Sequence, residues 1–80
     1  MHYVYLIRSI EYPGQTYIGL TNNLEARLDK HNSGGSPHTS KYRPWKLITY
    51  IAFSDRKQAS DFELYLKSGS GRAFAKNRLW

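Results

Sequence analysis

The sequence predicts an α/β domain of the α+β type, in which a three-stranded antiparallel sheet is flanked by helices. Residues 3–20 contain two short runs of β-branched and aromatic residues on either side of a turn, which is typical of a hairpin. Residues 45–53 form a third run of this kind, and segments with helical spacing of apolar residues lie before and after it. The expected order is strand, strand, helix, strand, helix and a short terminal helix.

The predicted hairpin joins the strands Tyr3–Ile7 and Thr16–Leu20 through a turn that contains proline and glycine. Side chains alternate between the two faces of a strand. If the turn places Tyr5 opposite Gly19, the ring of Tyr17 lies on the same face as that of Tyr5. Glycine weakens the interior of a strand, so its presence indicates that another group approaches the backbone closely. We therefore expect two phenols beside a close-approach glycine.

A first helix is predicted over Asn23–His31, with Thr21 and Asn22 as candidate caps and two glycines after its end. Two leucines, four residues apart, define its apolar stripe. With about 100° per residue, Arg27 and His31 lie ~40° apart along one border of that stripe. Because the helix must bury its leucines against the sheet, both polar side chains are carried to the edge of the buried face.

A mobile loop is predicted over residues 33–44, which are rich in glycine, serine and proline, and a third strand over Trp45–Phe53. Three cations lie in or next to this loop: Lys41, Arg43 and Lys46. Each is a candidate contact to a phosphate, and the alternative for each is simple solvation at the surface.

A second helix is predicted over Asp55–Lys67, with Ser54 as its N-cap. Ala59 and Leu66 mark its apolar face, and Glu63 falls within ~60° of the centre of that face. A buried carboxylate without a partner destabilises a fold by several kcal/mol. Glu63 is therefore expected to have a partner, and the pattern leaves open whether this is a structural cation or part of a functional site.

A short terminal helix is predicted over Arg72–Trp80. Basic residues gather at this end of the chain without acidic neighbours: Lys67, Arg72, Lys76 and Arg78. A cluster of one sign can follow a phosphate backbone, although terminal cations also serve as a solubilising fringe.

The composition indicates one domain over residues 1–80 with a small core. The absence of cysteine excludes disulfides, thiolate zinc sites and cysteine nucleophiles. Twelve Lys+Arg against 6 Asp+Glu give a formal charge of +6, which favours polyanionic partners such as nucleic acid. No apolar run approaches the ~18 residues that a membrane span needs. We expect no membrane partner and a cytoplasmic location.

The chain contains a group for each requirement of phosphodiester hydrolysis, which needs an activated water and stabilisation of charge on the phosphate. Glu63 can hold one Mg²⁺ or Mn²⁺ ion, with water and phosphate oxygens at the other positions. Arg27 supplies a permanent charge with a geometry suited to phosphate. Tyr17 or Tyr5 can position or deprotonate the water if nearby cations stabilise the phenolate. The alternatives are core tyrosines and a surface arginine.

Tyr3-Val4-Tyr5 and Tyr17-Ile18-Gly19, followed by Arg27, His31 and Glu63, resemble the signature of the GIY-YIG nuclease family. The resemblance covers essentially the whole chain. It is closest to the small single-domain members, which are related to the N-terminal catalytic domain of the excinuclease incision subunit. Tyr3 stands where the family name has glycine.

This resemblance implies an active site built from two tyrosines, an arginine, a histidine and a glutamate: Tyr5, Tyr17, Arg27, His31 and Glu63. It further implies that Glu63 carries a single divalent metal and that Tyr17 is the preferred general base, with His31 relaying or orienting the proton. A terminal asparagine recurs in the family, and Asn77 is the candidate counterpart.

Taken together, the residues and the resemblance predict a metal-dependent endonuclease that hydrolyses phosphodiester bonds in DNA. Structured or damaged DNA in repair or recombination is the expected substrate, with RNA as the alternative. Since the contacts would be mainly electrostatic, target choice would come from DNA structure or from a protein partner. A non-catalytic nucleic-acid-binding module with the same fold is the alternative function, and a small adaptor domain with only core aromatics is a third.

Overall fold

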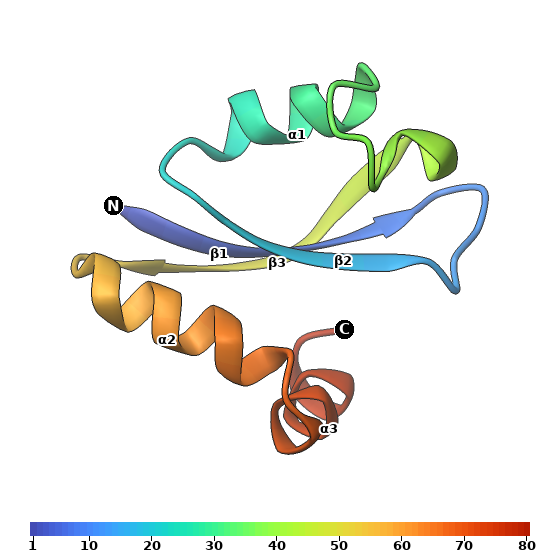
Figure 1. Ribbon diagram of the computed structural model, residues 1–80. Helices are drawn as coiled ribbons and strands as arrows, with labels where there is room; N and C mark the ends of the chain where they lie inside the picture. The colour runs from blue at the N-terminus through green and yellow to red at the C-terminus, as the bar shows by residue number, and fades with distance from the viewer.

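The antiparallel sheet expected from the sequence is the centre of the computed structural model, which describes residues 1–80. Strand β1 (His2–Ser9) lies between β2 (Thr16–Thr21) and β3 (Trp45–Phe53), so the strand order is β2-β1-β3 (Figure 1). The third strand has the predicted bounds, and the first two are slightly longer than predicted. The predicted α+β fold with the order strand, strand, helix, strand, helix, helix is confirmed.

The register of the hairpin is also the one that the sequence predicted. Tyr5 in β1 pairs with Gly19 in β2, and the ring of Tyr17 lies on the same face as that of Tyr5. The pairing of β1 with β3 contains one irregularity, between Leu6 and Ile7. A bulge of this kind increases the local twist of a sheet.

Helix α1 (Leu24–Asn32) covers one face of the sheet, and α2 (Arg56–Leu66) and α3 (Gly69–Arg78) lie on the other (Figure 1). Because side chains alternate along β1, each face has its own core. The core on the α2 and α3 side consists of Val4, Leu6, Ala59, Leu66 and Ala75. The core on the α1 side consists of Tyr5, Ile7 and Trp45, against which Leu24 and Leu28 pack. None of the helices has the length and apolar content needed to cross a bilayer.

Helix α1 begins one residue later than the sequence predicted. Its N-cap is Asn23, whose side-chain oxygen accepts a hydrogen bond from the backbone N–H of Ala26 at 3.0 Å. The prediction of Thr21 or Asn22 as the cap was wrong. The Thr21 hydroxyl instead accepts a hydrogen bond from the backbone N–H of Asn23 at 3.1 Å, and so holds the residue that caps the helix.

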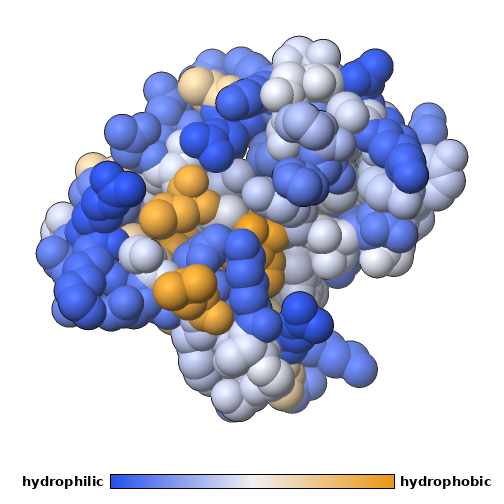
Figure 2. Space-filling view, in the orientation of Figure 1, coloured by the Kyte–Doolittle hydropathy of each residue, from blue (hydrophilic) through white to orange (hydrophobic).

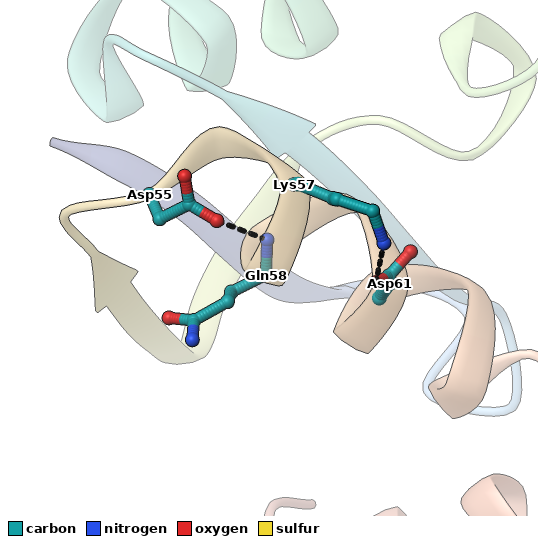
Figure 3. Close-up of polar contacts among 4 residues, drawn as sticks. All are labelled: Asp55, Lys57, Gln58 and Asp61. Carbon is teal, nitrogen blue, oxygen red and sulfur yellow. Dashed lines mark hydrogen bonds and ion pairs between the residues drawn. The ribbon is translucent and has the colours of Figure 1, made fainter.

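Helix α2 also begins one residue late, because Asp55 and not Ser54 is its N-cap. The Asp55 carboxylate accepts a hydrogen bond from the backbone N–H of Gln58 at 3.0 Å (Figure 3). One turn further on, Lys57 and Asp61 form an exposed ion pair at 2.8 Å (Figure 3). Ser and Asp are both favourable N-cap residues, and Asp55 has the extended backbone conformation that an N-cap requires.

The Ser68–Gly71 segment directly follows the predicted second helix, and it begins α3. The Ser68 hydroxyl accepts a hydrogen bond from the backbone N–H of Gly71 at 3.2 Å. A Cβ atom at Gly71 would overlap the backbone carbonyl of Tyr65, so only glycine allows the end of α2 to lie this close to the start of α3. The sequence predicted that the terminal helix starts at Arg72. In the structure it starts earlier, at Gly69.

The loop over residues 33–44 is anchored to the sheet, in contrast to the mobile loop expected. Gly34 adopts a φ of 84°, in the left-handed region that favours glycine, and a short 3₁₀ helix, η1, spans Ser40–Tyr42. Thr39 is buried, and its backbone carbonyl accepts a hydrogen bond from the Nε1–H of Trp45 at 2.8 Å. The loop thereby brings the Thr39 side chain to the inner face of α1.

Candidate active site

Tyr5 lies at the centre of the site because β1 is the middle strand and its odd-numbered residues face α1. The side chain is almost fully buried, and its ring lies over the backbone of Gly19 in the edge strand β2. A Cβ atom at Gly19 would overlap the Tyr5 hydroxyl. The group that approaches the glycine closely is therefore the Tyr5 phenol itself.

A chain of three buried side chains starts at this hydroxyl. The Tyr5 Oη and the Nε2 of His31 are 2.9 Å apart, and the Nδ1 of His31 is 2.7 Å from the Thr39 Oγ1. The Thr39 hydroxyl donates to the backbone carbonyl of Ser36 at 3.5 Å, so it is left to accept from Nδ1–H. The Nε2 of His31 then accepts the hydrogen of the Tyr5 hydroxyl.

Burial keeps His31 neutral, which agrees with this hydrogen-bond pattern. Desolvation lowers the pKa of His31 below its usual value, and the charges of Arg27 and Lys30 lower it further. Since a neutral imidazole has one donor and one acceptor nitrogen, it fits between the hydroxyls of Tyr5 and Thr39.

Tyr17 completes a group of three aromatic rings. Its ring centroid lies 6.3 Å from that of Tyr5 and 5.2 Å from that of His31. Tyr17 is only partly buried and also lines a groove open to solvent. Of the two phenols in the site, Tyr17 is therefore the one that a ligand can reach.

Tyr5 is a poor acid in this environment. Burial raises the pKa of Tyr5 to about 12, with a further increase from the neighbouring Tyr17. The charge of Arg27 acts in the opposite direction, and the charge of Glu63 raises the pKa again. Tyr5 thus stays protonated at neutral pH, and it lies near enough to both Arg27 and Glu63 to sense their charges.

Arg27 and Glu63 come from helices on opposite faces of the sheet, α1 and α2 (Figure 1). Both charges nevertheless act on the hydroxyl of Tyr5, which lies over Gly19 in the edge strand. An edge strand is where the two faces of a sheet meet, and the glycine there leaves room for the Tyr5 ring. The candidate site is therefore at the β2 edge.

Glu63 has an ionic partner, as its position on the apolar face of the predicted helix led us to expect. It lies on the same face of α2 as the buried Ala59 and Leu66, and its side chain is 15% exposed. One carboxylate oxygen is 2.7 Å from the Nζ of Lys67, whose side chain is 46% exposed. The partner is thus a surface lysine one turn away and not a cation sealed inside the core.

The sequence matches a family model described as the GIY-YIG catalytic domain, and the match covers residues 1–77. The chain belongs to the GIY-YIG family. The resemblance suggested by the two tyrosine motifs is thereby confirmed, although Tyr3 replaces the glycine of the first motif.

Two groups of relatives accompany this GIY-YIG match. The chain is 38% identical over 65 residues to a structure-specific endonuclease subunit SLX1 homolog from Giardia intestinalis, a match that covers 76% of this chain. It spans only 18% of the length of that protein. It is also 37% identical over 68 residues to the UPF0213 protein CPE1444 from Clostridium perfringens, covering 84% of this chain and 71% of that protein.

A solved structure has a similar fold. It is the solution NMR structure of the UPF0213 protein BH0048 from Bacillus halodurans, with 29% sequence identity and a TM-score of 0.56. The match covers 95% of this chain and 82% of that one. The small size and the element order of this GIY-YIG domain are therefore shared with a small relative.

A divalent metal fits this site only if one carboxylate holds it. No group of three or more histidine, cysteine, aspartate or glutamate side chains could form a protein cage for an ion. Glu63 offers a partly exposed carboxylate whose ionic partner is a half-exposed lysine. Mg²⁺ commonly keeps several waters and binds through one or two carboxylates together with substrate phosphates, so this donor set is compatible with Mg²⁺ or Mn²⁺.

The basic residues singled out from the sequence fall into two separate groups. The cations Lys67, Arg72 and Lys76 line one groove. In contrast, Lys41, Arg43 and Lys46 lie in the loop around η1 and at the start of β3. Asn77 is exposed on α3 and its side chain makes no hydrogen bond, so it is not joined to the tyrosine and histidine group.

Two residues near the site were not found from the sequence. Thr39 orients His31, but no spacing rule connects a loop threonine with a histidine eight residues earlier. Arg56, at the start of α2, lines a polar pocket of about 230 Å³ together with Arg27. The sequence carries no signal for Arg56, because only the fold brings the start of α2 to the end of β2 and the start of α1.

Proposed function

We propose that this GIY-YIG protein is a metal-dependent endonuclease that hydrolyses phosphodiester bonds in DNA. The observation that carries the proposal is the position of the Tyr5 hydroxyl, which contacts His31 and lies beside Tyr17. The charges of Arg27 and Glu63 also affect the pKa of this hydroxyl. These groups come from β1, β2, α1 and α2. A domain that only bound nucleic acid would need surface cations and no such convergence.

The burial of the two tyrosines supports different roles for them. Because the Tyr5 side chain is almost fully buried, we assign the activation of the attacking water to the more accessible Tyr17. The Tyr5 hydroxyl donates a hydrogen bond to the neutral His31, which fixes the position of the phenol beside Tyr17. In this assignment His31 orients the phenol, and Thr39 orients His31.

The charged residues act on the phosphate. Arg27 binds a phosphate oxygen and stabilises the negative charge that develops as the water attacks. Glu63 holds one Mg²⁺ or Mn²⁺ ion, which when bound supplies positive charge at the phosphate and the leaving oxygen. Lys67 must leave the carboxylate for this, and its half-exposed side chain is free to turn toward solvent.

We further propose that the substrate is structured DNA from repair or recombination. The Giardia intestinalis relative is named as a subunit of a structure-specific endonuclease, which supports both this substrate and a protein partner. The six cations Lys41, Arg43, Lys46, Lys67, Arg72 and Lys76 are the proposed phosphate contacts. Such contacts carry no sequence information, so the geometry of the DNA or the partner would select the target. RNA is the alternative substrate, and the cytoplasmic location stays a prediction.

A non-catalytic nucleic-acid-binding module is the second candidate function, and one observation favours it. The Glu63 carboxylate already has a cation at 2.7 Å, so it has no electrostatic need of a metal. In this case the protein would bind DNA equally well with or without divalent ions.

A panel of flapped, branched, nicked and plasmid DNA substrates, incubated with Mg²⁺ or with EDTA, separates the two candidates. An endonuclease cleaves at least one substrate with Mg²⁺ and none with EDTA. Binding to the panel without cleavage in Mg²⁺ or Mn²⁺ would support the binding module.

A further inference from the structure

A groove of about 780 Å³ lies between the end of the hairpin and the C-terminal part of the chain. Arg8, Gly14 and Thr16 form its hairpin side, and residues of α3 with the end of α2 form the other side. In Figure 2 the outline of the molecule is notched on one side, and hydrophilic side chains border the notch. The proposed catalytic mechanism meets this groove at Tyr17 and Lys67, and the other lining residues have no part in the chemical step.

The charged side chains in the groove all have one sign. Its lining contains four basic side chains, Arg8, Lys67, Arg72 and Lys76, and no acidic side chain. Of these cations only Lys67 has an acidic partner, and that partner is Glu63 of the candidate active site. A concave surface of this kind attracts phosphate groups.

Apolar and aromatic groups lie between these cations. Ile18 and the Trp80 ring contribute partly exposed apolar surface, whereas Leu66 and Ala75 lie beneath it as buried core residues. The guanidinium of Arg8 lies 5.4 Å from the centroid of the Trp80 ring. The groove therefore offers contacts to flat apolar groups as well as to phosphates.

Two residues connect the groove with the candidate active site. Tyr17 lines the groove, and its ring is 5.2 Å from that of His31. Lys67 lines the groove and contacts Glu63. A chain of phosphates bound at Arg72 and Lys76 would therefore continue toward Tyr17 and Glu63.

We propose that this groove binds an unpaired nucleic-acid strand on its way into or out of the active site. A single strand exposes both its phosphates and the faces of its bases, so it matches a groove that combines cations with apolar and aromatic groups. A duplex stacks its bases inside and would use only the cations. This inference rests on the proposed function for its substrate, and it specifies that the substrate has an unpaired segment beside the cleaved bond.

The test is direct binding of a fluorescently labelled oligothymidylate of about ten nucleotides, a length within the usual range for such sites. EDTA is present throughout, so that no strand is cleaved. In Arg72→Gln/Lys76→Gln we expect the affinity to fall by at least ~10-fold and the slope of log K against log salt to flatten by about 1.4. Lys30→Gln/Lys57→Gln removes the same charge from outside the groove and should weaken binding by less than about 2-fold.

Tryptophan fluorescence supplies an independent readout of the same binding. Trp45 is buried in the core and Trp80 lines the groove, so a bound strand should quench Trp80 alone. The quenching should be absent in Trp80→Phe, in which the unchanged emission of Trp45 reports an intact fold.

Three results would overturn the inference: equal losses of affinity in the two charge pairs, no change in Trp80 emission, or binding of a duplex of the same length as tightly as the single strand. The test of strand binding in the groove is independent of the test of endonuclease activity. Glu63→Gln should still bind the strand, so loss of cleavage with intact binding leaves the groove assignment standing. Cleavage that persists without groove binding removes only the groove assignment.

Discussion

Gly19 is the residue whose role is decided most clearly by contact geometry. The sequence predicted that some group approaches this glycine, but it could not say which. The structure identifies the Tyr5 phenol, because the paired register places Tyr5 directly opposite Gly19. A substrate is therefore not needed to explain the glycine.

We expect Gly19→Ala to lower the free energy of unfolding by about 1–3 kcal/mol, since the new methyl group would push the buried Tyr5 ring from its place. Gly14→Ala is the matched control, because no atom lies within 4 Å of a Cβ there. Urea denaturation of both variants checks the prediction. Equal free energies of unfolding in the two variants would contradict this prediction, because they would mean that the Tyr5 side chain can move aside at no cost in stability.

Glu63 shows both the success and the limit of sequence reasoning at this scale. Helical spacing alone indicated an inward carboxylate that needs a partner, and the structure supplies one in Lys67. Spacing could not identify the lysine, because Lys67 was grouped with the other C-terminal cations. An ion pair with one half-exposed partner is weak enough to be exchanged for a metal ion.

Lys67→Gln should therefore strengthen the binding of Mn²⁺ by about 3-fold, because the carboxylate no longer has a competing cation. Lys57→Gln is the control, since Lys57 forms the same kind of pair with Asp61 on the same helix. Isothermal titration calorimetry or the paramagnetic resonance signal of free Mn²⁺ measures the affinity without reference to cleavage. Unchanged or weaker binding in Lys67→Gln would argue against Glu63 as the metal ligand.

At the scale of elements, the strands and helices followed from local patterns, whereas the first residues of the helices did not. The β-branched and aromatic run over Trp45–Phe53 has no competing signal, and its bounds were predicted correctly. The starts of α1 and α2 were predicted one residue early, and the start of α3 was predicted too late. At α1 and α2 neighbouring residues, such as Ser54 and Asp55, can cap a helix, and the backbone conformation selects between them.

The cap of α2 can be tested by a pair of substitutions at adjacent positions. Asp55→Ala should lower the free energy of unfolding by about 1 kcal/mol, because the backbone N–H of Gln58 loses its acceptor. Ser54→Ala should change it by only a few tenths of a kcal/mol, since Ser54 is exposed and makes no such bond. Chemical denaturation resolves this difference. A larger loss in Ser54→Ala would contradict the observed cap.

At the scale of the whole molecule, the candidate site lies where one edge of the sheet brings two faces together. Arg27 and Glu63 come from helices on opposite faces of the sheet (Figure 1). Both charges affect the pKa of the buried Tyr5, whose ring lies over Gly19 in the edge strand. A helical wheel shows which face of a helix is buried, but not which edge of the sheet the helix crosses. The sequence could therefore nominate the residues, and only the fold could bring them together.

The two basic groups follow the same logic. In sequence, the loop cations and the C-terminal cations looked equivalent. In the fold, only the C-terminal group joins Arg8 from β1 in a groove that reaches Tyr17, while the loop group lies around η1. Arg8 could not be assigned to this surface from the sequence, because its position beside Trp80 depends on how α3 packs on the sheet.

The most direct test of the central claim is Mg²⁺-dependent cleavage of structured DNA by the wild-type protein and by two variants of α2. Glu63→Gln should cleave at least ~100-fold more slowly than wild type, since it removes the carboxylate assigned to the metal. Asp61→Asn removes an exposed carboxylate from the outer face of the same helix and should cleave at the wild-type rate. Circular dichroism should show all three proteins folded. If Glu63→Gln cleaves as fast as Asp61→Asn, the β2 edge is not the catalytic site.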